Sequence, residues 1–359
     1  MMHAMIMAGG GGTRFWPRSR AKRPKQFLTF SGERTLLQGT LDRIEARIPP
    51  ERTWVITGAA HSGEASRQLP DVPAAQIVGE PMGRDTAACI GLGAALVLKR
   101  DPTASIIVMP ADHVIEPVQE FQRAVHAAEQ ILEDYPDALL TFGIPPTWPA
   151  TGYGYIHRGD EVVSRQGVGA ARVRQFREKP SSDLAERFVA SGDYFWNSGI
   201  FVWKAATIMN ELKSQRPALY DSVTRIADAW GTPRQDEVFL NEYRDLEKIS
   251  IDYAVMEKAE TVLMLAAPYT WDDVGSWLAL ERRNPQDADG NTIQALHTGI
   301  ETTNCVIVSD PTHLIATINV SNLLIVQDGN ATLIADRRDE ATVKAIVDKL
   351  KAEGLGRFL

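Results

Sequence analysis

Short, uninterrupted apolar runs recur along the first two thirds of the chain. The clearest are residues 5–8 (MIMA), 53–58 (TWVITG), 105–110 (SIIVMP) and 138–143 (ALLTFG). Runs of this length without polar alternation are typical of parallel strands that are buried on both faces. The pattern therefore predicts a central sheet.

Helical patterns lie between these runs. In residues 120–135, apolar side chains return every three or four positions, at Phe121, Ala124, Val125, Ala128, Ile131 and Leu132. This spacing gives a helix one apolar stripe. Strands that alternate with such helices predict a doubly wound α/β sheet.

The pattern changes after the polar stretch 282–291 (RRNPQDADGN), which has the composition of a linker. Four short β-like runs follow, at residues 304–309, 313–320, 322–327 and 331–336. A terminal helix is expected from Val343, Ile346, Val347 and Leu350, with Gly354 as its cap. We therefore expect a first domain over residues 1–285 and a small β-rich domain over 290–359, without a strict sequence repeat.

Composition narrows the class of protein. The 359 residues carry a formal net charge of −8, which disfavours nucleic acid as a partner. The longest apolar run, residues 88–98, is too short to span a bilayer, and the start MMHAMIM lacks a charged leader. The two cysteines, Cys89 and Cys305, make no metal motif. These features predict a cytoplasmic protein that binds neither nucleic acid nor membrane.

One segment runs against the acidic balance. Gly9–Gly12 are followed by six cations within residues 14–25, at Arg14, Arg18, Arg20, Lys22, Arg23 and Lys25. Backbone N–H groups of a glycine loop after a strand can bind phosphate, and adjacent cations suit a polyphosphate. Neither the P-loop nor the dinucleotide fingerprint fits, because Thr13 and Arg14 stand where those motifs need other residues. A flexible turn is the alternative for the glycines alone.

Residues 8–27 (AGGGGTRFWPRSRAKRPKQF) resemble the signature of the sugar-1-phosphate nucleotidyltransferases, A-G-G-x-G-T-R-x-x-P followed by P-K-Q. The Trp16-Pro17 and Pro24–Phe27 details are similar to the mannose-1-phosphate guanylyltransferase branch of that family. Seven further segments match in family order, at residues 80–90, 109–115, 141–156, 176–180, 196–203, 250–258 and 271–277. Together they span about residues 5–280.

The resemblance implies a Rossmann-like, mixed but mostly parallel sheet with flanking helices, and a C-terminal domain like a left-handed β-helix. It implies that GTP and mannose 1-phosphate give GDP-mannose and pyrophosphate with Mg²⁺ as cofactor, by in-line attack without a covalent intermediate. Another sugar or base, and a non-catalytic regulator that binds sugar nucleotides, remain as alternatives. A homodimer is one candidate assembly.

The resemblance also assigns roles to residues of this sequence. Those expected at the nucleotide are Ala8, Gly9, Gly10, Gly11, Gly12, Thr13, Arg14, Lys25, Glu80, Pro81, Gly83, Asp85 and Asp112. Those expected at the sugar phosphate are Gly154, Glu178, Lys179 and Asn197. Asp112 and Asp273 would hold Mg²⁺, and Arg14, Lys25 and Lys179 would be catalytic.

Each assignment has a structural alternative. An aspartate after a strand, as at Asp112, is often a turn or cap residue, and the pair Glu178-Lys179 has the composition of an exposed charge pair. Asp85 would either read the base or act as the N-cap of the next helix. The family more often has Asn at that position. Asp272 is expected to be structural, in contrast to Asp273.

Overall fold

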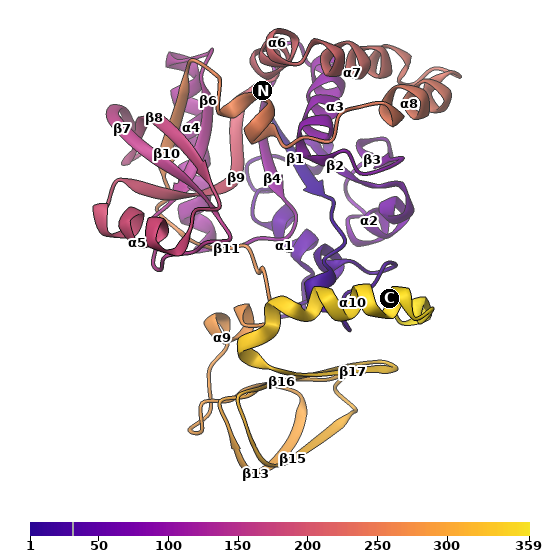
Figure 1. Cartoon of the computed structure of the whole chain (residues 1–359). Coiled ribbons are helices and arrows are strands. Elements are labelled where there is room, and N and C mark those ends of the chain that lie inside the picture. Colours follow the sequence, from indigo (N-terminus) through magenta and orange to yellow (C-terminus); the bar gives the residue numbers. More distant parts are fainter. Residues whose placement is uncertain (31) are drawn as a thin grey trace. The chain divides into compact units, whose positions relative to one another are not determined.

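The computed structural model describes residues 1–30 and 32–359, the side chains of residues 340 and 341 excepted. The chain forms two compact units, coloured along the sequence in Figure 1. The first unit contains residues 1–9, 40–111 and 115–271, and the second contains 10–39, 112–114 and 272–359. The basic segment after the first strand thus packs with the C-terminal quarter of the chain. The domain boundary at residues 285–290 stays a prediction.

The first unit is built on a nine-stranded sheet in the order β3-β2-β1-β4-β9-β6-β10-β8-β7. Its strands are β1 (Met2–Ala8), β2 (Thr53–Gly58), β3 (Ile77–Glu80), β4 (Ser105–Pro110), β6 (Leu139–Ile144), β7 (Gly154–Arg165), β8 (Val168–Glu178), β9 (Tyr194–Lys204) and β10 (Val262–Ala266). The four neighbouring strands β3, β2, β1 and β4 are parallel to one another. Strand β9 pairs antiparallel with β4. The predicted mixed α/β sheet is confirmed, and the four strands predicted from the apolar runs correspond to β1, β2, β4 and β6.

Helices flank this sheet. They are α2 (Ser62–Gln68), α3 (Asp85–Arg100), α4 (Val118–Asp134), α5 (Ser182–Ser191), α6 (Ala205–Gln215), α7 (Pro217–Ala229) and α8 (Gln235–Arg244), with a π-helical turn at Asp252–Met256. Every residue of α3 from Ala87 to Val97 is buried, and Figure 1 shows α6 and α7 beside this helix, with α8 next to α7. A Cβ at Gly93 would overlap with the Met5 side chain. The small residues of α3 therefore allow its close packing on β1.

The second unit contains the predicted β-rich segment. Its elements are β12 (Thr292–Gln294), β13 (Leu296–Thr303), β14 (Val306–Val308), β15 (Leu314–Ser321), β16 (Leu323–Asp328), β17 (Ala331–Asp336), α9 (Ala279–Arg283) and α10 (Val343–Ala352). Two short 3₁₀ helices, η1 (Thr13–Phe15) and η2 (Lys25–Phe27), come from the basic segment. The chain passes between the units five times: after residue 9, after residue 111, and within α1 (Leu36–Asp42), β5 (Val114–Glu116) and β11 (Thr270–Asp272).

The C-terminal strands form stacked coils. Leu296 pairs with Leu314 and Val306 with Leu324, the same offset of 18 residues in both cases (314 − 296 and 324 − 306). Both pairings are parallel, and β17 closes the sheet antiparallel to β16. The predicted β-helix-like arrangement is confirmed, while its left-handedness stays a prediction. The coil repeat lies in the pairing register, which is why no strict sequence repeat was visible.

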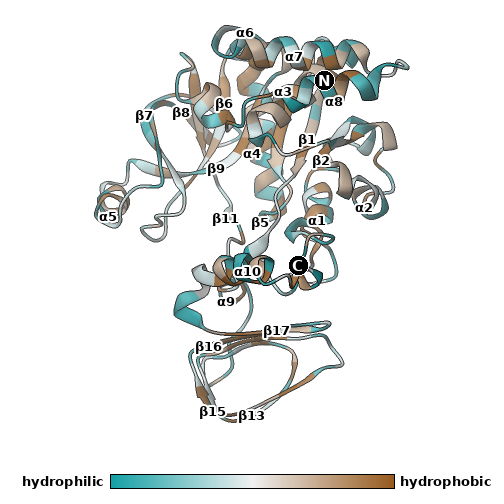
Figure 2. Cartoon of the chain, turned by 45° about the vertical axis from the view of Figure 1, so that its right-hand side comes forward, coloured by the Kyte–Doolittle hydropathy of each residue, from teal (hydrophilic) through white to brown (hydrophobic). Residues whose placement is uncertain are grey.

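The core of the second unit joins the two ends of the chain. The Phe15 ring lies 4.7 Å from the Phe30 ring and 5.2 Å from the Trp277 ring, centre to centre. Val343 and Val347 of α10 belong to the same buried cluster. The helix α10 mixes hydrophilic and hydrophobic residues along its length and lies along β16 and β17 (Figures 1 and 2). The predicted terminal helix is therefore present, with its apolar side chains on the buried face. It ends close to Gly354, the predicted cap residue, which has a φ of 73°.

No helix in the described part of the chain has both the length and the apolar character needed to cross a bilayer. The outward face of β13 and β15 exposes the large apolar side chains Leu296, Ile300, Leu314 and Ile318.

Candidate active site

A cavity of about 360 Å³ lies in the second unit. It is lined by Gly12, Thr13, Arg14, Phe15, Lys25, Asp112, His113, Asp273, Gly275 and Lys344. Six of these residues were expected at the triphosphate or the metal, and they come from three separate stretches of sequence. The cavity therefore brings together the glycine loop and the two aspartates assigned to a metal.

The glycine loop has a conformation that depends on its composition. Gly12 has a φ of 54°, a left-handed conformation that favours glycine. A Cβ at this position would also lie 2.5 Å from Lys25 Cβ, so there is no space for a side chain. Around Gly9 and Gly10, by contrast, an added Cβ would meet no atom within 4 Å. The Ser19 hydroxyl donates a hydrogen bond to the Gly12 carbonyl. Part of the loop is thus fixed and part is open to a ligand.

Lys25 connects the two aspartate segments. Its side chain is buried, and its Nζ donates to Asp112 Oδ2 at 2.7 Å and to the Asp273 carbonyl oxygen at 2.5 Å. The 3₁₀ helix η2 presents this side chain from within the segment that follows the glycine loop. Since an ammonium group has three N–H donors, one donor remains for a phosphate oxygen. Lys25 therefore both positions the site and leaves a contact for an anion.

The electrostatics of Asp112 favour its ionised form. Burial disfavours the charge, but the Lys25 ammonium and, to a smaller extent, His113 more than offset it, so the pKa of Asp112 lies below its ordinary value. Asp273 Oδ1 accepts a hydrogen bond from the Gly275 N–H at 3.1 Å. Two carboxylates in one open, polar cavity have the oxygen chemistry that Mg²⁺ prefers.

The site supplies only part of a metal's coordination shell. Among the side chains that the structure describes, no three from His, Cys, Asp or Glu cluster so as to hold a metal ion. Mg²⁺ usually binds one or two carboxylates and completes its shell with phosphate oxygens and water. Asp112 and Asp273 fit that arrangement, which needs a bound phosphate to be complete.

The neighbouring Asp272 has a different environment. It pairs with Arg282 through both oxygens, at 2.7 and 2.9 Å, and accepts the Val274 N–H at 2.7 Å. Its side chain is buried. The structural role expected for Asp272 agrees with these contacts.

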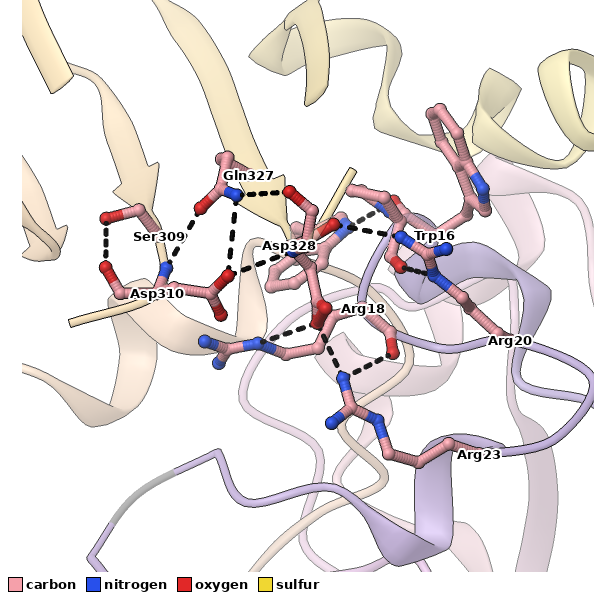
Figure 3. A network of polar contacts seen from close by, with 11 residues as sticks. Trp16, Arg18, Arg20, Arg23, Ser309, Asp310, Gln327 and Asp328 are labelled. Carbon is pink, nitrogen blue, oxygen red and sulfur yellow. Dashed lines mark hydrogen bonds and ion pairs between the residues drawn. The ribbon is translucent and has the colours of Figure 1, made fainter. Parts of the chain in front are cut away.

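The structure corrects the view that the whole basic run serves a polyphosphate. Figure 3 shows Arg18, Arg20 and Arg23 directed at the turn between β16 and β17. Arg23 donates to Asp328 Oδ2 at 2.6 Å, and Arg20 donates to the Asp328 carbonyl and to Asn330 Oδ1, both at 2.9 Å. Asp328 is only 13% exposed and carries an ion pair with Arg18 as well. Three of the six cations thus attach the loop to the C-terminal strands.

That turn is itself held by the preceding coil. The Asp310 carboxylate accepts the Gly329 N–H at 2.9 Å, and the Asp310 N–H donates to Gln327 Oε1 at 3.1 Å (Figure 3). Gln327 also donates to the Gly329 carbonyl at 2.9 Å. The arginines therefore bind a turn that the β-helix-like domain has already ordered.

A second group of predicted residues lies in the first unit. Gly154 pairs with Glu178 across β7 and β8, and a Cβ at Gly154 would overlap with the Glu178 carboxylate. The Asn197 amide donates to Asp252 Oδ1 at 2.8 Å. Burial, and then the Asp252 charge, raise the pKa of Glu178 above its ordinary value. Glu178, Asn197 and Asp252 thus form one polar cluster, with Gly154 making room for a carboxylate of the protein itself.

Asp252 is a residue of this cluster that sequence reasoning missed. Its pKa is raised, chiefly by burial, while the Asn197 hydrogen bond opposes the rise. The signal was present in the matched segment 250–258, but no role was attached to it. Lys179 follows β8 with a φ of 43°, its N–H donates to the Tyr153 carbonyl at 3.2 Å, and its side chain is exposed.

The segment expected at the base also lies in the first unit. Glu80, at the end of β3, is 8% exposed and accepts a hydrogen bond from the Tyr243 hydroxyl of α8. Burial raises the pKa of Glu80 to about 7, against the opposing effect of that hydrogen bond. A buried acceptor with one known partner has capacity for further donors.

Asp85 differs from its expected cap role. The helix α3 begins at Asp85, so Arg84 occupies the N-cap position, and Asp85 Oδ1 accepts the N–H of the next residue, Thr86, at 2.8 Å. Its φ of 65° is left-handed, a conformation that Asn and Asp tolerate better than most residues. The start of α3 is instead held by the Ile251 N–H, which donates to Thr86 Oγ1 at 2.8 Å.

Comparison with known proteins gives two family models that match in succession. Residues 3–290 match "Nucleotidyl transferase", and residues 296–350 match "MannoseP isomerase/GMP-like beta-helix domain". The mannose-1-phosphate guanylyltransferase of Escherichia coli K12 is 37% identical over 360 residues, covering 98% of this chain and 74% of the relative. The mannose-1-phosphate guanylyltransferase ManC of Salmonella typhimurium LT2 is 38% identical, with 98% and 74% covered.

A solved structure agrees with these matches. A protein of Thermus thermophilus, described as a mannose-1-phosphate geranyltransferase, superposes with a TM-score of 0.84 and 35% identity. The superposition covers 98% of this chain and 99% of the other.

Proposed function

Because the chain belongs to the nucleotidyl transferase family, we propose that it is a mannose-1-phosphate guanylyltransferase. It converts GTP and mannose 1-phosphate to GDP-mannose and pyrophosphate. The names of relatives that match nearly the whole chain support this reaction, since those relatives are 37–38% identical.

The observation that carries the proposal is the cavity of the second unit. Gly12, Lys25, Asp112 and Asp273 line it together, so that backbone N–H groups, an ammonium and two carboxylates occupy one small space. Backbone donors and cations suit phosphate oxygens, and carboxylates suit the cation that accompanies a nucleoside triphosphate. We assign Ala8 and residues 9–14 with Lys25 to the triphosphate.

Asp112 and Asp273 would hold Mg²⁺. When bound, the ion supplies neutralisation of the charge on the phosphate oxygens. Lys25 keeps Asp112 ionised and holds it beside the Asp273 backbone, so the two carboxylates are ready before a ligand arrives. Arg14, exposed at the cavity, adds a guanidinium that can bind two phosphate oxygens at once.

The chemistry needs no covalent intermediate. A phosphate oxygen of mannose 1-phosphate attacks the α-phosphorus of GTP, the bond from that phosphorus to the bridging β-phosphate oxygen breaks, and pyrophosphate leaves. The protein contributes positioning and charge compensation. We assign the exposed Lys179 to the attacking phosphate, and Glu178, Asn197 and Gly154 to the surroundings of the sugar.

We assign the base to the segment Glu80–Asp85, including Pro81 and Gly83. Guanine presents N1–H and a 2-amino group side by side, and a carboxylate accepts both. Glu80 is the better candidate of the two acids, because it is buried and held by Tyr243, whereas Asp85 is exposed.

The test is a pyrophosphate-release assay in which GTP, ATP, CTP and UTP are each combined with mannose 1-phosphate, glucose 1-phosphate and N-acetylglucosamine 1-phosphate. We expect release chiefly with GTP and mannose 1-phosphate. Release with a different pair would reassign the substrates within the family. No release with any pair, from a protein that still binds GDP-mannose in calorimetry, would favour the regulator.

A further inference from the structure

The cavity contains one cation that no sequence motif indicated. Lys344 lines it together with Thr13, Arg14, Asp112 and Asp273. Lys344 comes from α10, in the C-terminal domain, more than 300 residues after the glycine loop. It stands among residues assigned to phosphate and metal, although the family's motifs lie before residue 280.

The fold gives the Lys344 backbone a defined place. Its neighbour Val343 and, one turn later, Val347 are each 3% exposed in the core that contains Phe15. Phe15 belongs to η1, which directly follows the glycine loop. The start of α10 is therefore packed against the same core as the loop, while the Lys344 side chain is exposed toward the cavity.

The charges that line the cavity favour a further cation for phosphate binding. The carboxylates Asp112 and Asp273 repel phosphate, and the Lys25 ammonium already binds Asp112. Among the residues that the structure describes, Lys344 has no ion-pair or hydrogen-bond partner. An exposed ammonium on a flexible stem reaches an anion without breaking an existing contact. Its charge adds to that of Arg14 at the open side of the cavity.

We propose that Lys344 is a phosphate-binding residue of this site, and that it contacts the β- and γ-phosphates of the nucleotide and the pyrophosphate that they become. The inference rests on the proposed function for the identity of the ligand. It assigns the C-terminal domain a direct part in substrate binding, besides its structural part.

The experiment compares Lys344→Ala, Lys344→Glu and Lys344→Arg with Lys351→Ala in the full-length protein. Lys351 lies on the same helix and is exposed, but its charge faces Asp348 at 3.8 Å and it does not line the cavity. Calorimetry measures pyrophosphate binding in the presence of Mg²⁺. Steady-state assays give KM for GTP and, separately, for mannose 1-phosphate.

We expect Lys344→Ala to weaken pyrophosphate binding and raise KM for GTP by roughly tenfold. Lys344→Glu should weaken both further, and Lys344→Arg should restore them. KM for mannose 1-phosphate and the melting temperature should stay unchanged, which separates a ligand contact from a structural defect. Pyrophosphate affinity and KM for GTP equal to those of Lys351→Ala would overturn the proposal.

Failure of the two proposals can be told apart. Pyrophosphate binding is measured without turnover, so it tests Lys344 directly. The substrate assay of the unmodified protein tests the transferase reaction. If the unmodified protein makes GDP-mannose but the Lys344→Ala variant binds pyrophosphate normally, the proposed function stands and the proposal for Lys344 is wrong.

Discussion

The two adjacent aspartates, Asp272 and Asp273, have different environments, and we assign a structural role to the first and a metal-binding role to the second. Asp272 is buried and paired with Arg282, whereas Asp273 faces the cavity with Asp112. We expect Asp273→Asn and Asp112→Asn each to lower turnover by roughly a hundredfold or more, because each removes a ligand of the proposed Mg²⁺. The melting temperature of the Asp273 variant should change little.

Asp272→Asn is the matched control. It leaves a guanidinium without its bidentate partner and should lower the melting temperature, with an unfolding cost of about 1–3 kcal/mol. The double variant of Asp112 and Asp273 should be little worse than either single one, since residues that act as a unit are not additive. Fully multiplicative losses would argue against a shared ion.

Glu80 gives a pH-dependent prediction. Its folded pKa is about 7, raised from 4.5 by burial, so the folded state holds a proton that the unfolded state releases between these values. Folding stability from this group is therefore fully present below pH 4.5 and is lost as pH rises through about 7. At about 1.4 kcal/mol per unit the loss is of the order of 3 kcal/mol. Denaturation at about pH 5 and about pH 8 should show it in the unmodified protein.

Glu80→Gln should remove that pH dependence, because an amide does not titrate. The same carboxylate must be ionised to accept both guanine donors, so KM for GTP should fall as pH rises from about 6 to about 8 in the unmodified protein. In the Gln variant, KM for GTP should be higher and nearly flat over this range. A flat KM profile in both proteins would remove Glu80 from base recognition.

At the residue scale, the sequence identified those site residues that stand in contiguous motifs. Asp112, Asp273 and Lys25 were predicted, and they line one cavity. Tyr243 and Lys344 could not be predicted, because a hydroxyl on α8 and an ammonium on α10 acquire a role only when folding brings them to β3 and to the cavity. Arg18, Arg20 and Arg23 look like Arg14 in sequence, and only tertiary contacts separate them.

At the element scale, the glycine loop contains positions with opposite requirements. Gly12 has a left-handed φ and no room for a Cβ, whereas Gly9 has open space around it. We expect Gly12→Ala to destabilise the protein by about 1–3 kcal/mol, because the backbone is strained and the methyl group meets Lys25. Thermal denaturation measures this cost.

Gly9→Ala serves as the comparison. It should leave the melting temperature nearly unchanged, but it should raise KM for GTP if the phosphates approach the backbone there. A variant with unchanged stability and unchanged KM for GTP would show that Gly9 lies away from the triphosphate.

The apolar runs located β1, β2, β4 and β6 because buried parallel strands need continuous hydrophobic sequence. They missed β13 (LHTGIETT), since polar and apolar residues mix in a strand whose outward face is exposed. Strand β7 of the long β7–β8 hairpin was missed for the same reason. The coils of the C-terminal domain repeat in backbone geometry, with left-handed residues at Asn304 and Asn322, and sequence identity does not carry that repeat.

At the scale of the whole molecule, the glycine loop and the basic run after it pack against the C-terminal part of the chain. Residues 10–39 belong to the same compact unit as residues 272–359. The turn at Asp328 holds Arg20 and Arg23, and the Trp16 indole N–H donates to the Phe358 carbonyl at 2.8 Å. The C-terminal domain is therefore a scaffold for the loop that we assign to the triphosphate.

Weakening this scaffold without removing it gives the last prediction. Asp328→Ala removes the acceptor of Arg23 and Arg18 from a site that is 13% exposed, leaving two guanidinium groups without their carboxylate. We expect a stability loss of about 1–3 kcal/mol, because a partly buried charged donor loses its partner. KM for GTP should rise while KM for mannose 1-phosphate stays close to normal, since the residues assigned to the sugar belong to the other unit. Asp348→Ala, which removes only an exposed pair with Lys351, should change neither value. Equal increases in both KM values for Asp328→Ala would mean that the turn supports the protein as a whole and not the loop in particular.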